Sequence, residues 1–325
     1  MPFQLRSIRS RHLEGNVWGD PVDRDLVVYL PPRAAEAMCP RLVVLLHGYS
    51  GRAANWLVPD HFRGSGTRPS LAGLLDEVFA DPAVPAAVVA MPDGWTRLGG
   101  GQWLDSPVNG RLASYVAEEV VDAVEAEFGT DPDPASRVVL GHSSGGLGAW
   151  ELATTTDRFG ALGFLAGDAF FERTHLGFVT ELLAAHPGID GLDPAAVPPS
   201  AALPLALAAS YSPDPAARIP VRLPLDWRTG RLVDEVWDAW LAKDPVVNAA
   251  ARRDRLARLR SILLDTGDRD EYAAQLGQRV LAERLVELGI PHRAVEFPGG
   301  HSTHTHERVA LAIGELLRAT AGDAG

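Results

Sequence analysis

The sequence predicts an α/β protein with a mostly parallel central sheet and helices on both faces. Short apolar runs that suit strands alternate along the chain with segments of helical periodicity, a pattern typical of parallel sheets. The clearest run, LVVLL at residues 42–46, is apolar at every position, as expected for a strand buried on both faces. With 325 residues, of which 46% are hydrophobic and 22% charged, the chain is long enough for a sizeable core.

Apolar runs with strand character are interpreted as the strands of this sheet. The first, LVVYL at residues 26–30, is ended by Pro31 and Pro32. The others are residues 42–46, 86–91, 138–140, 161–166, 261–266 and 293–297.

Three segments between or after these runs predict helices. In residues 115–128 an apolar side chain recurs every four residues, and Gly129 suits the end of a helix. A similar stripe in residues 272–288 is followed by Gly289. Residues 309–317 carry a last apolar stripe near the end of the sequence.

One segment interrupts the alternation of strands and helices. Residues 176–224 are rich in Pro, Ala and Gly, and residues 232–241 then form an amphipathic helical pattern. Because long insertions in α/β domains are often functional, two interpretations stay open for residues 176–245. They are an insertion that packs on the core, or a lid-like segment over the active site. In both cases residues 1–325 are expected to form a single domain.

Charge and composition argue against several classes of partner. The chain carries 42 acidic residues against 30 Lys and Arg, a net charge of −12, which disfavours nucleic acid and anionic membrane surfaces. Cys39 is the only cysteine, so an intrachain disulfide is excluded. No stretch approaches the roughly 18 apolar residues of a membrane span, and residues 1–13 lack the apolar core of a signal peptide. We therefore expect a cytoplasmic protein.

The strongest local motif is GHSSG at residues 141–145, which matches G-x-S-x-G. It directly follows the predicted strand 138–140 and precedes a helix-like stretch. A serine on such a sharp strand-to-helix turn has an exposed hydroxyl, and small residues are needed where strand and helix pass closely. Ser143 is therefore the candidate nucleophile, with Gly141 and Gly145 as the small residues.

A serine nucleophile needs a histidine base oriented by a carboxylate, and in α/β-hydrolases the chain order is serine, acid, histidine. His301 follows Gly299 and Gly300 just past the predicted strand 293–297. Three aspartates compete to be the acid. Asp265 lies within the preceding predicted strand, and Asp268 and Asp270 lie in the loop after it. Between these last two the residues alone do not decide.

Acyl transfer also needs N–H donors for the developing oxyanion. The backbone of Ser144, next to the nucleophile, is one candidate, and Tyr49, in the turn after the predicted strand 42–46, is the other. Trp56, Trp95 and His142 are candidates for contacting the substrate. No acidic or cysteine cluster accompanies the histidines near residue 301, so neither a metal nor another cofactor is expected.

Further motifs are spread over most of the chain, and together they resemble the putative-esterase family of α/β-hydrolases. That family includes esterase D (S-formylglutathione hydrolase), feruloyl esterases and mycolyltransferases. The motifs are residues 15–16 (GN), 19–21 (GDP), 24 (R), 28–32 (VYLPP), 45–51 (LLHGYSG), 55–56 (NW), 91–94 (MPDG), 115–119 (YVAEE) and 240–245 (WLAKDP).

The resemblance implies an α/β-hydrolase fold with an insertion before the acid-bearing strand. It implies that the acid is Asp270, three residues after Gly267, and it also points to His301 in Gly-Gly-His. The family's S-formylglutathione hydrolases usually carry a Gly-Leu-Thr-Cys-type oxyanion loop, whereas this chain has GYSG at residues 48–51. That particular substrate is therefore not implied.

The predicted function is a metal-free serine carboxylesterase that hydrolyses a small-molecule ester through an acyl-enzyme intermediate. Two alternatives remain. An acyltransferase would use the same triad with an alcohol in place of water, and a non-catalytic binding protein would use the hydrolase fold alone. The oligomeric state and the ester itself are not predicted.

Overall fold

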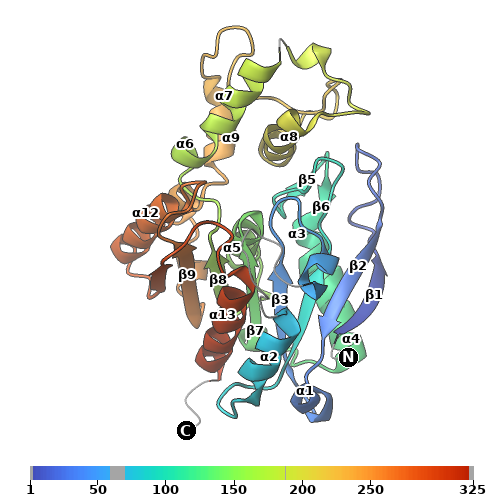
Figure 1. Ribbon diagram of the computed structural model, residues 1–325, viewed down its shortest axis with the longest axis vertical. Helices are drawn as coiled ribbons and strands as arrows, with labels where there is room; N and C mark the ends of the chain where they lie inside the picture. Colours follow the sequence, from blue (N-terminus) through green and yellow to red (C-terminus); the bar gives the residue numbers. More distant parts are fainter. Residues whose placement is uncertain (1–2, 59–69, 187, 322–325) are drawn as a thin grey trace.

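A computed structural model describes residues 3–58, 70–186 and 188–321 of the chain. Its centre is an eight-stranded sheet in the order β1-β2-β4-β3-β7-β8-β9-β10 (Figure 1). The first two neighbouring pairs, β1 with β2 and β2 with β4, are antiparallel, and all later pairs are parallel. The expected mostly parallel sheet is thus confirmed.

The strands of the large sheet are β1 (Phe3–Arg9), β2 (Asp23–Tyr29), β3 (Arg41–Leu46), β4 (Ala87–Pro92), β7 (Arg137–His142), β8 (Ala161–Leu165), β9 (Ser261–Gly267) and β10 (Arg293–Phe297). A small second sheet pairs β5 (Asp105–Ser106) with β6 (Gly110–Arg111). Strand β1 has no counterpart in the sequence prediction, because its residues are half-buried or exposed and its apolar residues are few.

The α-helices are α1 (Pro32–Glu36), α2 (Leu71–Ala80), α3 (Leu112–Ser114), α4 (Val121–Phe128), α5 (Ser144–Thr155), α6 (Phe171–Thr174), α7 (Leu176–Ala185), α8 (Pro199–Tyr211), α9 (Asp234–Leu241), α10 (Pro245–Asn248), α11 (Arg253–Leu256), α12 (Ala274–Glu287) and α13 (Thr305–Thr320). Short 3₁₀ turns lie at Ala53–Leu57, Pro134–Ser136 and Ile189–Gly191, and a π-helical turn at Tyr115–Val120.

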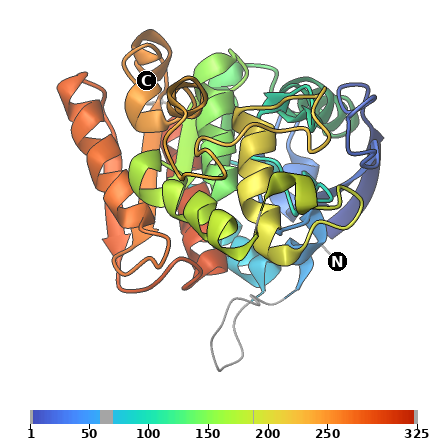
Figure 2. The same ribbon diagram turned by 90° about the horizontal axis from the view of Figure 1, so that it is seen from above.

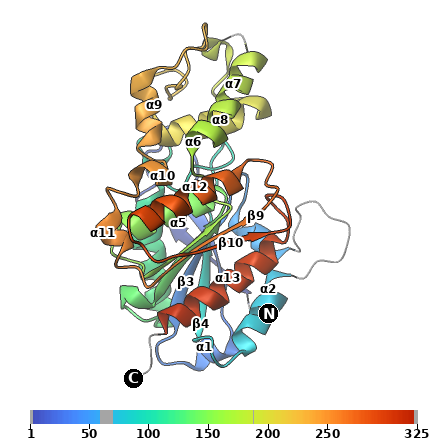
Figure 3. The ribbon, with the colours of Figure 1, turned by 90° about the vertical axis from the view of Figure 1, so that its left-hand side faces the viewer.

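Helices cover both faces of the sheet, as the continuous apolar strands predict. Along β3, Leu42, Val44 and Leu46 face the core formed with α4, α5 and α12. Val43 and Leu45 face the opposite core, which α2 and α13 complete. Both faces of this strand are therefore buried, and Figure 3 shows α13 and α2 together on one side of the sheet.

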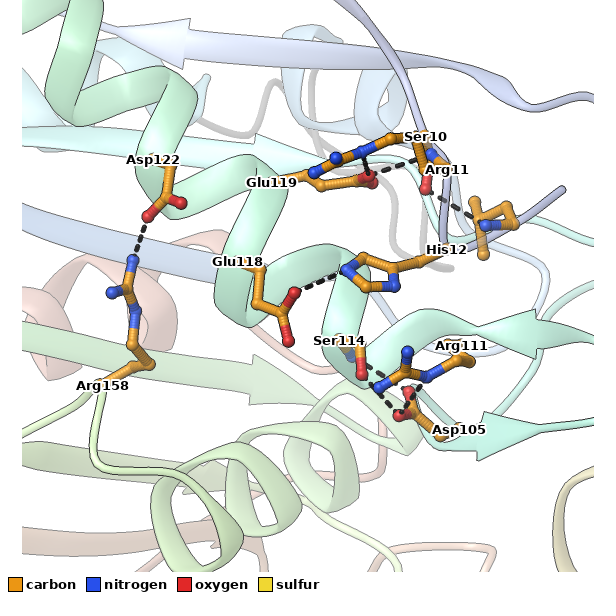
Figure 4. Close-up of polar contacts among 11 residues, drawn as sticks. Ser10, Arg11, His12, Asp105, Arg111, Ser114, Glu118, Glu119, Asp122 and Arg158 are labelled. Carbon is orange, nitrogen blue, oxygen red and sulfur yellow. Dashed lines mark hydrogen bonds and ion pairs between the residues drawn. The ribbon is translucent and has the colours of Figure 1, made fainter.

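The π-helical turn joins α3 to α4, so the helix predicted over residues 115–128 forms with one irregular turn. Two glutamates of this turn hold the loop that follows β1 (Figure 4). His12 Nε2 lies 2.7 Å from Glu118 Oε2, and the Arg11 amide donates to Glu119 Oε1 at 2.9 Å. These contacts anchor the edge of the sheet to the helix behind it.

Helices α6 to α9 gather at one end of the molecule, beyond the sheet (Figure 1), and Figure 2 shows α7 and α8 in front of the central strands when seen from that end. They share an apolar cluster of their own, which includes Leu182, Leu205, Trp237 and Trp240. Most of residues 176–211 is helical, although the Pro and Gly residues of this segment conceal this in the sequence. The predicted helix 232–241 corresponds to α9.

Within the ranges that the structure describes, no helix is long and apolar enough to cross a membrane. The same residues contain no group of three or more His, Cys, Asp or Glu side chains placed to hold a metal ion.

Candidate active site

Ser143 lies on the turn between β7 and α5, where the sequence motif placed it. Its backbone has φ 58° and ψ −126°, a conformation that a non-glycine residue rarely adopts. The Ser143 amide donates to Leu165 O at 2.9 Å, and the Gly146 amide donates to Ser143 O at 2.8 Å. These bonds hold the strained residue, and its side chain lines a cavity.

The glycines of the motif are required by close backbone contacts. A Cβ atom on Gly145 would lie 2.7 Å from His47 O, and one on Gly146 would lie 2.8 Å from the Gly167 Cα. Real side chains do not reach such distances, so α5 approaches the loops after β3 and β8 only because these residues lack a side chain.

His301 and Asp270 form a hydrogen-bonded pair beside Ser143. His301 Nδ1 lies 2.7 Å from Asp270 Oδ2, and both residues are buried. His301 follows β10 and Asp270 follows β9, so two adjacent parallel strands bring them together at their carboxyl ends. No hydrogen bond joins Ser143 Oγ to His301 among the described residues, although both side chains line the same cavity.

The other two candidate acids make different contacts. Asp268 accepts a hydrogen bond from the Gly299 amide at 2.9 Å and so holds the loop before His301. Asp265 forms an ion pair with Arg308 of α13. Of the three aspartates, the structure thus brings Asp270 to the imidazole.

Both backbone groups of His301 are also held. Its amide donates to Glu271 Oε2 at 2.8 Å, and its carbonyl oxygen lies 2.8 Å from His142 Nε2. The Tyr272 ring packs edge-on against the imidazole, with ring centroids 4.8 Å apart. Besides Asp270, His301 is therefore held by two contacts to its backbone and by one to its ring.

Asp270 is placed to remain ionised. Burial by itself would raise the pKa of Asp270, but the hydrogen bond and charge of His301, with the amides of Tyr272 and Ala274, outweigh it and lower that pKa below its usual value. An ionised Asp270 fixes His301 with its Nδ1 protonated, which leaves Nε2 free to accept a proton.

Two backbone N–H groups near Ser143 have no hydrogen-bond acceptor among the described residues. They belong to Ser144, the first residue of α5, and to Tyr49, in the loop after β3. That loop touches the nucleophile turn, since a Cβ on Gly48 would lie 3.0 Å from the Ser143 Cβ. The predicted pair of oxyanion donors is therefore near the serine and unoccupied by protein acceptors.

Buried His47 anchors this loop after β3. Its Nε2 accepts from the Gly94 amide at 2.9 Å, so its Nδ1 carries the proton and donates to Gly48 O at 2.9 Å. Burial lowers the pKa of His47, which keeps the ring neutral. Trp103 Nε1 donates to His47 O at 2.9 Å and completes the support.

The cavity has a volume of about 780 Å³ and extends from Ser143 to the helices α6, α7 and α8. Thr174 and His175, at the end of α6, and Phe178, Leu203 and Leu207, from α7 and α8, form its far wall. Of the predicted substrate-contacting residues, Trp56 and His142 line the cavity. Trp95 does not, because its ring packs under the Arg52 guanidinium, 4.0 Å from the ring centroid.

The sequence prediction missed several residues of the cavity wall, notably Asp168 and His175. Asp168 lies three residues beyond the end of β8, so its position at the carboxyl end of a predicted strand was a usable signal. No local pattern identifies His175, Phe178 or the leucines of α8, because their place in the wall depends on how the insertion folds.

Comparison with protein families matches residues 21–311 to the model described as "Putative esterase". Among curated proteins, the S-formylglutathione hydrolase of Mus musculus is 30% identical over 130 residues, which is 38% of this chain and 43% of that protein. The enzyme of the same name from Rattus norvegicus is 32% identical over the same shares. The match thus spans about two fifths of the length of these curated relatives.

Solved structures share the fold. A ferulic acid esterase superposes with a TM-score of 0.65 at 16% identity, covering 98% of both chains. An S-formylglutathione hydrolase from Staphylococcus aureus superposes with a TM-score of 0.61 at 14% identity, covering 97% of this chain and 98% of that one. At these identities the likeness concerns the fold, and it confirms the α/β-hydrolase architecture.

Proposed function

Because the chain belongs to the putative esterase family, a class of ester-hydrolysing serine hydrolases, we propose that it is a carboxylesterase with Ser143, His301 and Asp270 as its triad. The observation that carries the proposal is the buried 2.7 Å contact between His301 and Asp270, next to a serine held at φ 58° in the same cavity. Strained backbone of this kind persists only where the surrounding structure enforces it, and it gathers at active sites.

The reaction follows from the proton positions. His301 Nε2 takes the proton of Ser143 as Oγ attacks the ester carbonyl, and Asp270 stabilises the imidazolium that forms. The amides of Tyr49 and Ser144 donate to the oxyanion of the tetrahedral intermediate. His301 then gives its proton to the departing alcohol, and water, deprotonated by the same imidazole, releases the acid from the acyl-enzyme. The missing Ser143–His301 hydrogen bond is compatible with this role, since such bonds tighten when substrate binds.

We also propose that the helices of residues 176–245 act as a roof for the substrate. Phe178, Leu203 and Leu207 place apolar side chains opposite the nucleophile, where an acyl or alcohol chain would lie. Apolar walls with a few polar groups are the usual lining of small-molecule sites.

The decisive experiment is initial-rate hydrolysis of 4-nitrophenyl esters with acyl chains from C2 to C12, by the wild-type enzyme and by Ser143→Ala. We expect the variant to lose about 10⁴-fold or more in kcat and to lose labelling by a fluorophosphonate probe. The optimal chain length measures the acyl part of the cavity.

Two other results would replace the proposal. An alcohol acceptor that captures most of the acyl group in place of water would establish an acyltransferase. Absence of hydrolysis and of labelling in the folded wild-type protein would leave a binding protein on a hydrolase fold.

A further inference from the structure

The active-site cavity is electrostatically one-sided. Among the described residues that line it, Asp168 and Glu271 carry carboxyl groups, and none is Lys or Arg. Glu271 Oε2 already accepts a hydrogen bond from the His301 amide. Asp270 adds a further buried negative charge behind His301. Apart from histidines, the carboxylates are therefore the only ionisable acid or base groups of Asp, Glu, Lys or Arg type among the described lining residues.

Asp168 is the acid of this wall that the proposed triad chemistry does not use. It follows β8 in the loop that leads into α6, and it is partly buried. Within the described residues its carboxylate makes no hydrogen bond and no ion pair, although it lines the cavity. An ionised carboxyl group that is partly shielded from water and has no partner loses hydration without compensation, so the site is suited to a donor that arrives from outside.

The neighbours of Asp168 on the roof side cannot supply a positive charge. Burial lowers the pKa of His175 to about 3 and raises that of Tyr211, so both are neutral at pH 7. Burial raises the pKa of Asp168 itself to about 7; the charge of His301 opposes this rise, and Asp270 and Asp244 add to it. The carboxylate is thus held close to neutralisation in the absence of a ligand cation.

We propose that Asp168 binds a protonated amine of the substrate, and that the enzyme prefers esters carrying an ammonium group over neutral esters of the same shape. The inference rests on the proposed esterase function and assigns its substrate class. The ammonium would donate a hydrogen bond to the Asp168 carboxylate, while Phe178 and the neutral rings around it contact the carbon skeleton.

The test uses two pairs of esters that differ in charge and little in shape. Protonated 2-(dimethylamino)ethyl acetate is compared with 3-methylbutyl acetate, and ethyl alaninate with ethyl 2-methylpropanoate, which places the cation on the alcohol side or on the acyl side. The measured quantity is the ratio of kcat/KM for the cationic ester to that for the neutral ester at pH 7. Intrinsic reactivity and active-enzyme concentration cancel when this ratio is compared between variants.

For at least one pair, we expect Asp168→Asn to lower the ratio by about 10- to 100-fold, the range of one charge-assisted hydrogen bond. Asp254→Asn removes the same charge from the exposed surface of α11, outside the cavity wall, and its ratio should equal that of the wild type. An unchanged ratio in Asp168→Asn for both pairs, with measurable hydrolysis, overturns the inference while leaving the esterase intact. If the wild-type protein shows neither hydrolysis nor labelling of Ser143, the esterase proposal is overturned, and the inference with it.

A second measurement needs no variant. Protonated 3-methylbutylamine should inhibit the wild-type enzyme at least 10-fold more strongly than 3-methylbutan-1-ol, which has the same carbon skeleton without the charge. Equal inhibition by the two compounds would contradict the inference even if Asp168→Asn failed to fold.

Discussion

Asp268 and Asp270 bear the same side chain two residues apart, yet each contacts a different part of the histidine loop. Asp268 bonds the Gly299 amide, and Asp270 bonds the His301 imidazole. The local sequence cannot separate them, because the choice depends on how the loop after β9 turns against the loop after β10. Ser143 and His301 could be proposed from the sequence, since each sits in a short pattern whose geometry is local.

The two aspartates allow a matched comparison. We expect Asp270→Asn to lower kcat by about 10³- to 10⁴-fold, because the imidazole loses the partner that sets its tautomer and stabilises its charge. Asp268→Asn removes one contact to a backbone amide and should lower kcat by about 10-fold or less. Steady-state kinetics on one 4-nitrophenyl ester measures both. Equal losses of kcat in the two variants would mean that Asp270 is not the triad acid.

Asp168 should also leave a mark on stability. Its folded-state pKa, about 7, is well above the ordinary value near 4, so between these pH values the folded chain binds more protons than the unfolded chain. Its contribution to the free energy of unfolding is therefore full below about pH 4 and declines as the pH rises to about 7.

Asp168→Asn removes the cost to stability of ionising this carboxyl group in the folded protein at high pH. The variant is expected to melt about 2–4 °C higher than the wild type at pH 8, with a smaller difference at pH 5. Differential scanning calorimetry at the two pH values tests it. A variant that melts lower than the wild type at pH 8 would show that Asp168 stabilises the fold.

At the scale of elements, continuous apolar strands and four-residue helical stripes predicted the centre of the sheet and the helices α12 and α13. The insertion was harder. Helix α8 contains Pro204 and is buried along most of its length, so it shows no amphipathic period, and it packs against the cluster that contains Trp237 and Trp240. Its alanines and leucines favour a helix locally, but its place in the molecule is set by this tertiary contact.

Two glycines in different helices separate close packing from helix propensity. In Gly145→Ala the new methyl group would lie 2.7 Å from the His47 carbonyl oxygen, so α5 must move. We expect the free energy of unfolding to fall by about 2 kcal/mol or more, and most of the activity to be lost. In Gly177→Ala on α7 nothing lies within 4 Å, so a gain of about 0.5–1 kcal/mol is expected. Thermal melting measures both signs, and destabilisation by Gly177→Ala would contradict the packing of α7.

At the scale of the whole molecule, the net charge of −12 and the absence of Lys and Arg from the described residues of the cavity wall act in the same direction. The overall charge could be counted from the sequence. The charge of the side chains that line the cavity could not be predicted from the sequence. The wall is formed by residues from the loop after β3 through to α13, and no single one of them indicates that charge.

The negative charge of the molecule and of the carboxylates in the cavity wall should disfavour the binding of anionic esters. We expect mono-4-nitrophenyl adipate to have a kcat/KM at least 10-fold below that of 4-nitrophenyl hexanoate at low ionic strength, with the gap narrowing as NaCl screens the repulsion. Initial rates between 10 mM and 500 mM NaCl test this. A gap that is absent, or that widens with salt, would mean that the negative side chains do not face the bound acyl group.

Asp270 and Glu271 are consecutive residues, and they grip the same histidine at its ring and at its main-chain amide. One short loop thus makes two contacts, and the ring and the amide that it binds lie a fixed distance apart in the same residue. An insertion or deletion of a single residue between Gly267 and Tyr272 would move both carboxylates off their targets at once, whereas a point substitution affects one. In evolutionary terms, the length of this loop is therefore under stricter constraint than its composition, and divergence at this site should proceed by replacement rather than by indels.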